Sequence, residues 1–186
     1  MEREEDKMLA GAPYRAADPE LVAKRARARL LARRLSEGDD VLLELLGAVG
    51  SGVEIVPPFF CDYGRNIYVG SRVFLNTNCV ILDCARVEIG DDVQIGPGVH
   101  LYAATHPLDA TERRSGLERA APVTIGPDVW IGGGTVVCPG VVIGDGTTIG
   151  AGSVVVRDVP AGVVAAGNPC RVLRTLDAGD RHGTGA

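Results

Sequence analysis

The chain has 186 residues with a formal net charge of −5 at pH 7, and 46% of its residues are hydrophobic. Glycine is abundant, at 25 residues, whereas aromatic residues are scarce, with 3 Phe, 4 Tyr and 1 Trp. The apolar content argues against disorder, and the lack of a period of three excludes collagen. A negative chain has no global positive field, so neither nucleic acid nor an anionic membrane is expected as a partner.

The N-terminal part is rich in helix formers. A helix is predicted over residues 19–35, because Asp18 is a suitable N-cap and Pro19 a suitable first helical residue. Gly38 is predicted to end this helix, and the leucine spacing predicts a second helical stretch over residues 39–49. The arginines of the first helix are interpreted as a solvated face, or as a few side chains that reach a neighbouring site.

The sequence also bears on location. The charged N-terminus is not followed by a hydrophobic signal-peptide region, and no run of about 18 apolar residues is present to span a bilayer. The five cysteines form no CxxC pair, which fits reduced and mostly buried thiols better than a disulfide framework. These observations predict a cytoplasmic protein.

A repeat of six residues begins at Val69. Branched apolar residues occupy one position of the repeat: Val69, Leu75, Ile81, Ile89, Ile95, Leu101, Ile125, Ile131, Val137, Ile143, Ile149 and Val155. A small or β-branched residue stands four positions after each of them: Val73, Cys79, Ala85, Val93, Val99, Thr105, Val129, Thr135, Val141, Thr147, Ser153 and Val159. This period fits neither an α-helix nor an uninterrupted strand, and it predicts very short strands joined by tight, glycine-containing turns. It is typical of the hexapeptide type of parallel β-helix.

The later repeats carry very little charge. Residues 121–160 contain four charged side chains, Asp128, Asp145, Arg157 and Asp158. A solenoid with so few charges presents flat apolar and hydroxyl-lined faces, and a contiguous surface of this kind commonly marks an interaction site. The sequence therefore predicts a homo-oligomer that packs through these faces.

The period fails over residues 102–124, which are predicted to leave the solenoid as a loop. Loops carried by a rigid scaffold often hold binding or catalytic groups. His106 stands at the root of this loop and is one of three histidines, the others being His100 and His182. His106 is therefore the first candidate for chemistry.

Short motifs run along nearly the whole chain: Lys7-Met8-Leu9-Ala10-Gly11, Tyr14-Arg15, Cys61-Asp62-Tyr63-Gly64, Ile89-Gly90-Asp91, Pro97-Gly98-Val99, Ala104-Thr105-His106-Pro107, Val123-Thr124-Ile125-Gly126, Val129-Trp130-Ile131-Gly132, Pro139-Gly140-Val141 and Gly167-Asn168-Pro169-Cys170-Arg171-Val172. With these motifs the chain resembles the maltose and galactoside O-acetyltransferase group of the left-handed β-helix, hexapeptide-repeat family, and it is closer to the maltose branch. The resemblance implies a mainly β fold, a left-handed parallel β-helix over residues 56–172 with the protruding loop 102–124. An N-terminal helical segment, residues 1–55, would contribute to the acceptor site, and residues 173–186 would form a C-terminal tail.

The resemblance also implies the reaction. It predicts an acetyltransferase that moves an acetyl group from acetyl-CoA to a hydroxyl, the 6-hydroxyl, of a sugar such as maltose or glucose, with sites between the subunits of a homotrimer. His106 aligns with the catalytic base of the family, and imidazole suits proton transfer at neutral pH. Gly133 aligns with the residue whose backbone N–H stabilises the oxyanion. No metal is expected.

The resemblance assigns two groups of binding residues. The acceptor group is Arg25, Asp62, Asn76 and Asp83, and Asn76 is also a candidate to hold the acetyl carbonyl. The coenzyme group is Trp130, Gly133, Ala151, Val156, Arg157, Arg171 and Arg174, in which arginine suits the phosphates. Two sugar-binding carboxylates of the galactoside branch are replaced here by Ala16 and Cys84, with Asp18 as a candidate substitute for the first. We therefore expect glucose or maltose in preference to a galactoside.

Other interpretations remain open at this point. The chain is alternatively a non-sugar acetyltransferase of the same family, a non-catalytic scaffold, or a zinc lyase of the carbonic anhydrase type. The zinc lyase needs three histidines around one metal, and His100 and His106 are expected at successive corners, with no third histidine near. A covalent route through Cys79 or Cys138 is disfavoured, because both occupy packed repeat positions without a neighbouring base in the sequence.

Overall fold

The computed structural model describes residues 2–177. His182 and residues 178–186 of the predicted tail lie outside the described residues. Helix α1 (Glu4–Leu9) precedes strand β1 (Tyr14–Arg15) and the long helix α2 (Pro19–Ser36). The predicted start of α2 is confirmed, because the Asp18 carboxylate accepts hydrogen bonds from the backbone N–H groups of Glu20 and Leu21.

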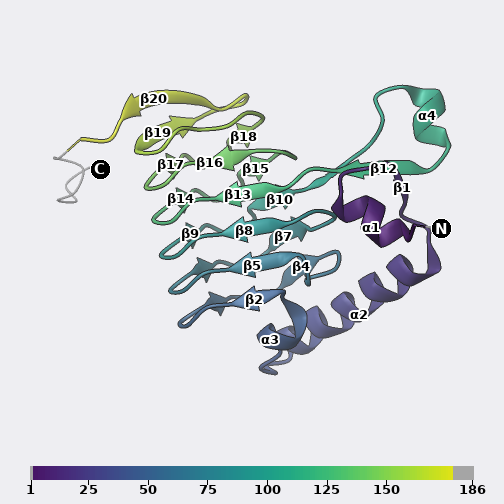
Figure 1. The fold of residues 1–186 in the computed structure, drawn as a ribbon. Coiled ribbons are helices and arrows are strands. Elements are labelled where there is room, and N and C mark those ends of the chain that lie inside the picture. Colours follow the sequence, from purple (N-terminus) through teal and green to yellow (C-terminus); the bar gives the residue numbers. More distant parts are fainter. Residues whose placement is uncertain (1, 178–186) are drawn as a thin grey trace.

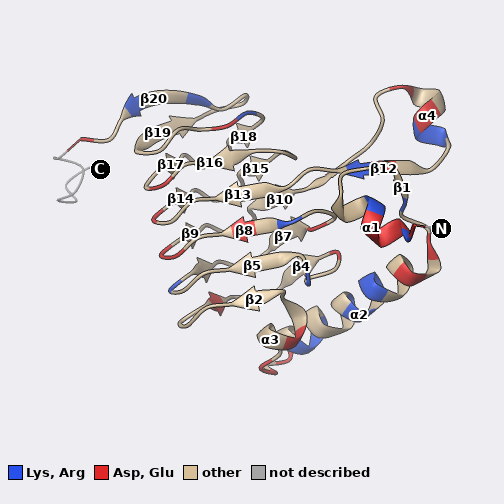
Figure 2. Cartoon of the chain, viewed as in Figure 1, with Lys and Arg blue, Asp and Glu red and all other residues tan. Residues whose placement is uncertain are grey.

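One face of α2 is buried against the solenoid. Its buried residues are Leu21, Ala28, Leu31 and Ala32, which recur at helical spacing, and the helix packs against strand β4 (Phe59–Cys61). Figure 2 shows charged residues along the length of α2 and on the neighbouring α1. Gly38, with φ of +95°, follows the end of the helix as predicted.

The second predicted helical stretch was too long. Only Leu42–Leu45 form a helix, α3, and the chain is extended from Leu46 onward. A Cβ atom on Gly47 would lie 2.4 Å from the carbonyl oxygen of Arg65, so the backbone here already packs tightly against the next turn of the solenoid. Ala48–Val49 form strand β2 and start the first coil. This long-range pairing overrides the helical spacing of the leucines.

Three parallel sheets form the sides of the solenoid (Figure 1). Sheet 1 contains β2, β5 (Ile67–Val69), β8 (Val87–Ile89), β13 (Val123–Ile125) and β16 (Val142–Ile143). Sheet 2 contains β3 (Glu54–Ile55), β6 (Phe74–Leu75), β9 (Gln94–Ile95), β14 (Trp130–Ile131), β17 (Thr148–Ile149), β19 (Val163–Ala166) and the antiparallel β20 (Arg171–Thr175). Sheet 3 contains β4, β7 (Cys79–Leu82), β10 (His100–Tyr102), β15 (Val136–Val137) and β18 (Val154–Val155). From β2 to β10 and again from β13 to β18, successive strands fall on successive sheets, as the hexapeptide period predicts.

The repeat positions form the core. Every member of the branched apolar series is buried, and so is the second series except Thr105. The buried hydroxyls of Thr135, Thr147 and Ser153 donate hydrogen bonds to main-chain carbonyls, which satisfies them inside the narrow interior. Thr105 is exposed because the chain has already left the coil there.

The corner between sheets 3 and 1 is wider than the other two. Val69 pairs with Ile89, 20 residues later, whereas Ile125 pairs with Ile143, 18 residues later, because the earlier coils hold two more residues at this corner. The long excursion of residues 102–124 leaves from the same corner. Both features place extra side chains at one edge of the prism.

The excursion is more ordered than the predicted loop. Strand β11 (Ala104–Thr105) pairs with β12 (Leu117–Ala120) around helix α4 (Ala110–Arg114), and β12 also pairs with β1. In Figure 1 this three-stranded antiparallel sheet lies beside α1. The N-terminal segment is thereby tied to the excursion that carries His106.

Candidate functional site

His106 follows strand β11 directly, at the start of the excursion. Its side chain is exposed, while the next residue, Pro107, is buried and anchors the turn. In residues 2–177 no hydrogen bond to the imidazole is present. A fixed backbone thus presents a free imidazole at the wide corner, which suits proton transfer to or from a bound molecule.

Asp83 organises the corner beneath the excursion. Its carboxylate is fully buried and accepts hydrogen bonds from the backbone N–H groups of Asp62 (3.0 Å), Tyr63 (2.8 Å) and Asn66 (3.2 Å). Burial raises the pKa of Asp83 to about 6, although these N–H donors act in the opposite direction. Asp83 was expected from the sequence to contact the acceptor directly. In the structure its carboxylate is inaccessible, and it holds the backbone of residues 62–66 instead.

Asp62 is the accessible carboxylate of this corner. It is half-buried, and the Cys84 thiol donates to its Oδ2 over 3.5 Å. Burial raises the pKa of Asp62, while the Cys84 thiol and the positive charges of Arg25 and Arg29 lower it. Asp62 therefore presents a partly buried carboxylate near the positive charges of Arg25 and Arg29.

Arg25 reaches this corner from α2. Its guanidinium donates to the Tyr63 hydroxyl and to the main-chain carbonyl of Ala16, each at 2.6 Å, and lies 5.6 Å from the centre of the Tyr63 ring. The position that lacks a carboxylate, Ala16, thus contributes its backbone oxygen to Arg25. Asp18, the candidate substitute for that carboxylate, caps α2 through its Oδ1.

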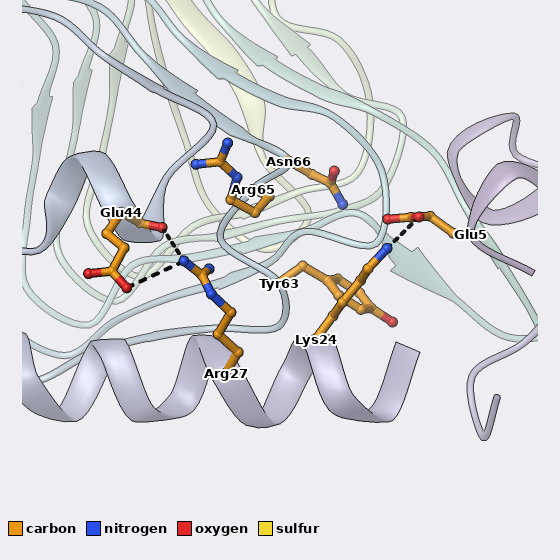
Figure 3. Close-up of a pocket in the computed structure, with 7 residues that line it drawn as sticks. All are labelled: Glu5, Lys24, Arg27, Glu44, Tyr63, Arg65 and Asn66. Atoms are coloured by element: carbon orange, nitrogen blue, oxygen red, sulfur yellow. Dashed lines mark hydrogen bonds and ion pairs between the residues drawn. The ribbon is translucent and has the colours of Figure 1, made fainter. Parts of the chain in front are cut away.

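A polar hollow of about 570 Å³ lies on the other flank of α2 (Figure 3). It is lined by Glu5, Lys24, Arg27, Glu44, Tyr63, Arg65 and Asn66. Figure 3 shows ion pairs at its two ends, Glu5 with Lys24 at 2.5 Å and Glu44 with Arg27 at 3.5 Å. These pairs fasten α1 and α3 to α2, and so they hold the helix that positions Arg25.

A second, shallower groove of about 370 Å³ follows sheet 2 and its corner with sheet 3. It is lined by Phe74, Asn76, Gln94, Ile95, Gly96, Pro97, Trp130, Gly132, Gly133, Thr148, Ile149, Gly150 and Ala151. Trp130 is 57% exposed on its wall. The N–H groups of Gly133 and Ala151 donate no hydrogen bond within the described part of the chain, so both remain available to a molecule in the groove. Four predicted site residues, Asn76, Trp130, Gly133 and Ala151, therefore meet here.

Asn76 has one side of its amide fixed. Its Oδ1 accepts a hydrogen bond of 2.7 Å from the Thr77 N–H, which leaves Nδ2 as a donor beside the groove. Within one chain Asn76 is thus grouped with the coenzyme residues and not with Asp62.

The remaining coenzyme candidates lie at two places. Arg171 and Arg174 lie on β20, which ends sheet 2 and runs past residue 173, where the tail was predicted to begin. Val156 and Arg157 follow β18 at the corner between sheets 3 and 1, and both are exposed. The structure therefore divides the predicted residues between two edges of the prism.

Sequence reasoning missed Tyr63 and Glu118. Tyr63 bridges Asp83 and Arg25 although its motif was noted only as a resemblance. Glu118 lies on β12, and its Oε2 accepts from the Tyr14 hydroxyl at 3.0 Å. Nothing local marks Glu118, because its partners come from a strand 104 residues earlier.

Thiol and metal chemistry find little support. Burial raises the pKa of all five thiols, that of Cys84 to about 12, and nucleophilic cysteines need the reverse. Among residues 2–177 no group of three or more His, Cys, Asp or Glu side chains is arranged to hold a metal ion. No helix of the same region is long and apolar enough to cross a bilayer.

Comparison with known proteins places this architecture. Residues 122–157 match the bacterial transferase hexapeptide family (six repeats), and residues 7–50 match the maltose acetyltransferase hexapeptide capping motif. The crystal structure of a maltose O-acetyltransferase from Clostridium difficile 630 is 43% identical, covers 95% of this chain and 98% of its own, and has a TM-score of 0.92. The chain belongs to the hexapeptide-repeat O-acetyltransferases.

Two further relatives extend the comparison of this O-acetyltransferase chain. The structure of a galactoside acetyltransferase in complex with coenzyme A is 36% identical, covers 100% of this chain and 97% of its own, and has a TM-score of 0.94. Nodulation protein L from Rhizobium leguminosarum bv. viciae is 53% identical over 96 residues, 47% of this chain, which spans about half (50%) of that relative. The predicted maltose and galactoside O-acetyltransferase group is confirmed.

Proposed function

We propose that the protein transfers an acetyl group from acetyl-CoA to a hydroxyl of a sugar. The observation that carries this proposal is that the chain presents a free imidazole, His106, at one corner and, at another corner, a groove whose wall offers the free N–H of Gly133. A base and an oxyanion donor are the two groups that acyl transfer to an alcohol requires. Family membership and the coenzyme A complex of the galactoside acetyltransferase relative support the same reaction.

The chemistry follows from these two groups. The acceptor oxygen attacks the thioester carbonyl carbon while His106 takes the hydroxyl proton. The carbonyl oxygen becomes an oxyanion that accepts from the Gly133 N–H, with Asn76 Nδ2 as a second donor. The C–S bond then breaks, and the imidazolium returns the proton to the departing thiolate. The products are the acetyl ester and coenzyme A.

A homotrimer brings the two groups together. His106 belongs to the corner of sheets 3 and 1, whereas the groove follows the corner of sheets 2 and 3. Because the two surfaces differ, contact between them is heterologous, and a closed ring satisfies every copy. The three-sided cross-section favours a ring of three. The upper coils, nearly free of charge in Figure 2, supply the faces that pack.

Each binding group has a chemical task in this arrangement. Arg25 and Asp62 bind acceptor hydroxyls, for which a neutral sugar such as maltose or glucose is proposed, and the 6-hydroxyl is the one acetylated. Trp130 and the Ala151 N–H contact acetyl-CoA in the groove, with Val156 packing beside it. Arg157, Arg171 and Arg174 bind its phosphates.

The experiment is an acetyl-CoA assay with thiol release as the readout, over maltose, glucose, galactosides and small non-sugar alcohols. Turnover with a sugar that is lost in His106→Ala supports the proposal, and His100→Ala is the matched control that keeps activity. Turnover restricted to non-sugar alcohols would point to the non-sugar acetyltransferase. The trimer is tested by mixing His106→Ala with Trp130→Ala, since interfaces that combine an intact His106 with an intact groove restore activity.

A further inference from the structure

Glu118 occupies the middle strand of the antiparallel sheet formed by β1, β12 and β11. It pairs with Tyr14 of β1 on one side. On the other side the ladder between β11 and β12 ends at the pair of Thr105 and Arg119, and the residues next to that pair are His106 and Glu118. Residues directly opposite in an antiparallel pair have Cβ atoms about 5 Å apart.

Burial shows which way this small sheet faces. Side chains alternate between the two faces of a strand, and directly opposite residues share a face. The exposed members Arg15, Thr105 and Arg119 form the outer face. The inner face, toward the wide corner, holds the buried or half-buried Tyr14, Ala104, Glu118 and Ala120. His106 has the parity of this inner face, and its exposed side chain stands at the open end of the face, just past the end of β11.

The Glu118 carboxylate is held over the corner. The Tyr14 hydroxyl donates to Oε2 at 3.0 Å, and Tyr14 is itself fully buried. The negative charge of Glu118 contributes to raising the pKa of Asp62, which shows that it acts across the acceptor cluster. Oε1 accepts no hydrogen bond from the residues that the structure describes. One carboxylate oxygen is therefore fixed, and the other is available to a further donor.

We propose that Glu118 is a positioning residue for His106, an inference that rests on the proposed function. When His106 takes the acceptor proton, its ring becomes a cation, and an ionised carboxylate across the strand stabilises that cation and orients the ring. The proton remains on the imidazole and is not passed on to Glu118. Hydrogen bonds of this kind are often absent without substrate and form in the bound complex.

The test compares Glu118→Gln with the parent protein. Gln keeps an oxygen that can accept from Tyr14, so the sheet is expected to stay folded, as checked by thermal denaturation. We expect kcat to fall at least tenfold, the KM for acetyl-CoA to stay unchanged, and the acidic limb of the kcat/KM profile to move about one pH unit lower. Glu112→Gln, which removes an exposed carboxylate from α4 of the same excursion, is the matched control with no change.

A substrate-free measurement separates this inference from the proposed function. NMR spectra of the substrate-free protein should show changed ring chemical shifts of His106 in Glu118→Gln and unchanged ones in Glu112→Gln, whatever the acceptor proves to be. Tyr14→Phe, which releases Oε2, should lower kcat in the same direction but by less, and it serves if Glu118→Gln does not fold. Unchanged ring chemical shifts of His106, or a rise in acceptor KM alone with the pH profile intact, would overturn the inference. If the parent protein transferred no acetyl group to any acceptor, the proposed function would be refuted instead.

Discussion

The thiol of Cys84 lies 3.5 Å from Oδ2 of Asp62 and donates to it. Burial raises the pKa of Asp62, and this contact lowers it, so the thiol favours the ionised form of the carboxylate at the acceptor site. Replacing Cys84 with Ala should raise the acceptor KM about threefold to tenfold and leave the KM for acetyl-CoA unchanged. Steady-state kinetics with each substrate varied check this expectation.

The control for Cys84→Ala is Cys79→Ala. Cys79 is also buried, but its thiol donates to the carbonyl of Gly96 on the far side of sheet 3 from Asp62. Both variants lose a buried sulfur, so both lower stability, and only the first should change the acceptor KM. Equal KM changes in the two variants would show that packing, and not the Asp62 contact, is responsible.

Asp83 should make stability depend on pH. Its pKa is raised from 3.8 to about 6 in the fold, so between these values the folded state holds a proton that the unfolded state has released. The contribution of Asp83 to the free energy of unfolding is therefore fully present below about pH 4 and is lost as the pH rises through about 6. A shift of about two pH units corresponds to a contribution of about 3 kcal/mol. Denaturant titrations from pH 4 to 7 measure this slope.

The same titrations on Asp83→Asn isolate the effect. The amide does not ionise, so the difference in stability between parent and variant should shrink as pH rises through 6. At pH 4 the variant should be less stable by about 1–3 kcal/mol, because one amide oxygen cannot satisfy three backbone donors. Parallel pH profiles for the two proteins would assign the dependence to other carboxyls.

The solenoid was predictable because its information is local. Six-residue spacing puts Ile131, Val137 and Ile143 into the core without reference to distant partners, and all three are buried. The acceptor corner was predicted only in part, because the tie between Tyr14 and Glu118 spans 104 residues. The burial of Asp83 could not be predicted either, because the sequence does not show that three backbone N–H groups donate hydrogen bonds to its carboxylate.

Gly133 should reveal whether a backbone donor drives catalysis. Its N–H makes no hydrogen bond within the described chain, and removing one oxyanion donor costs about 10²–10³ in kcat. Gly133→Pro removes the N–H, so kcat should fall by that factor. Gly133→Ala keeps the N–H and brings a Cβ within 3.0 Å of the Pro97 carbonyl oxygen, so its effect should be smaller. Equal losses in the two variants, at equal thermal stability, would argue for steric disturbance instead.

The N-cap of α2 should connect stability with acceptor binding. Asp18 accepts from two backbone N–H groups at the start of the helix that carries Arg25, so Asp18→Ala should cost about 0.5–2 kcal/mol of stability. Fraying of the first turns should also loosen Arg25, which is seven residues from the cap, and raise the acceptor KM while the KM for acetyl-CoA stays constant. Asp18→Asn retains a capping oxygen and should restore both properties. If Asp18→Ala lowers stability but leaves the acceptor KM unchanged, the hydrogen bond from Arg25 to the Tyr63 hydroxyl is sufficient to position Arg25 without the cap.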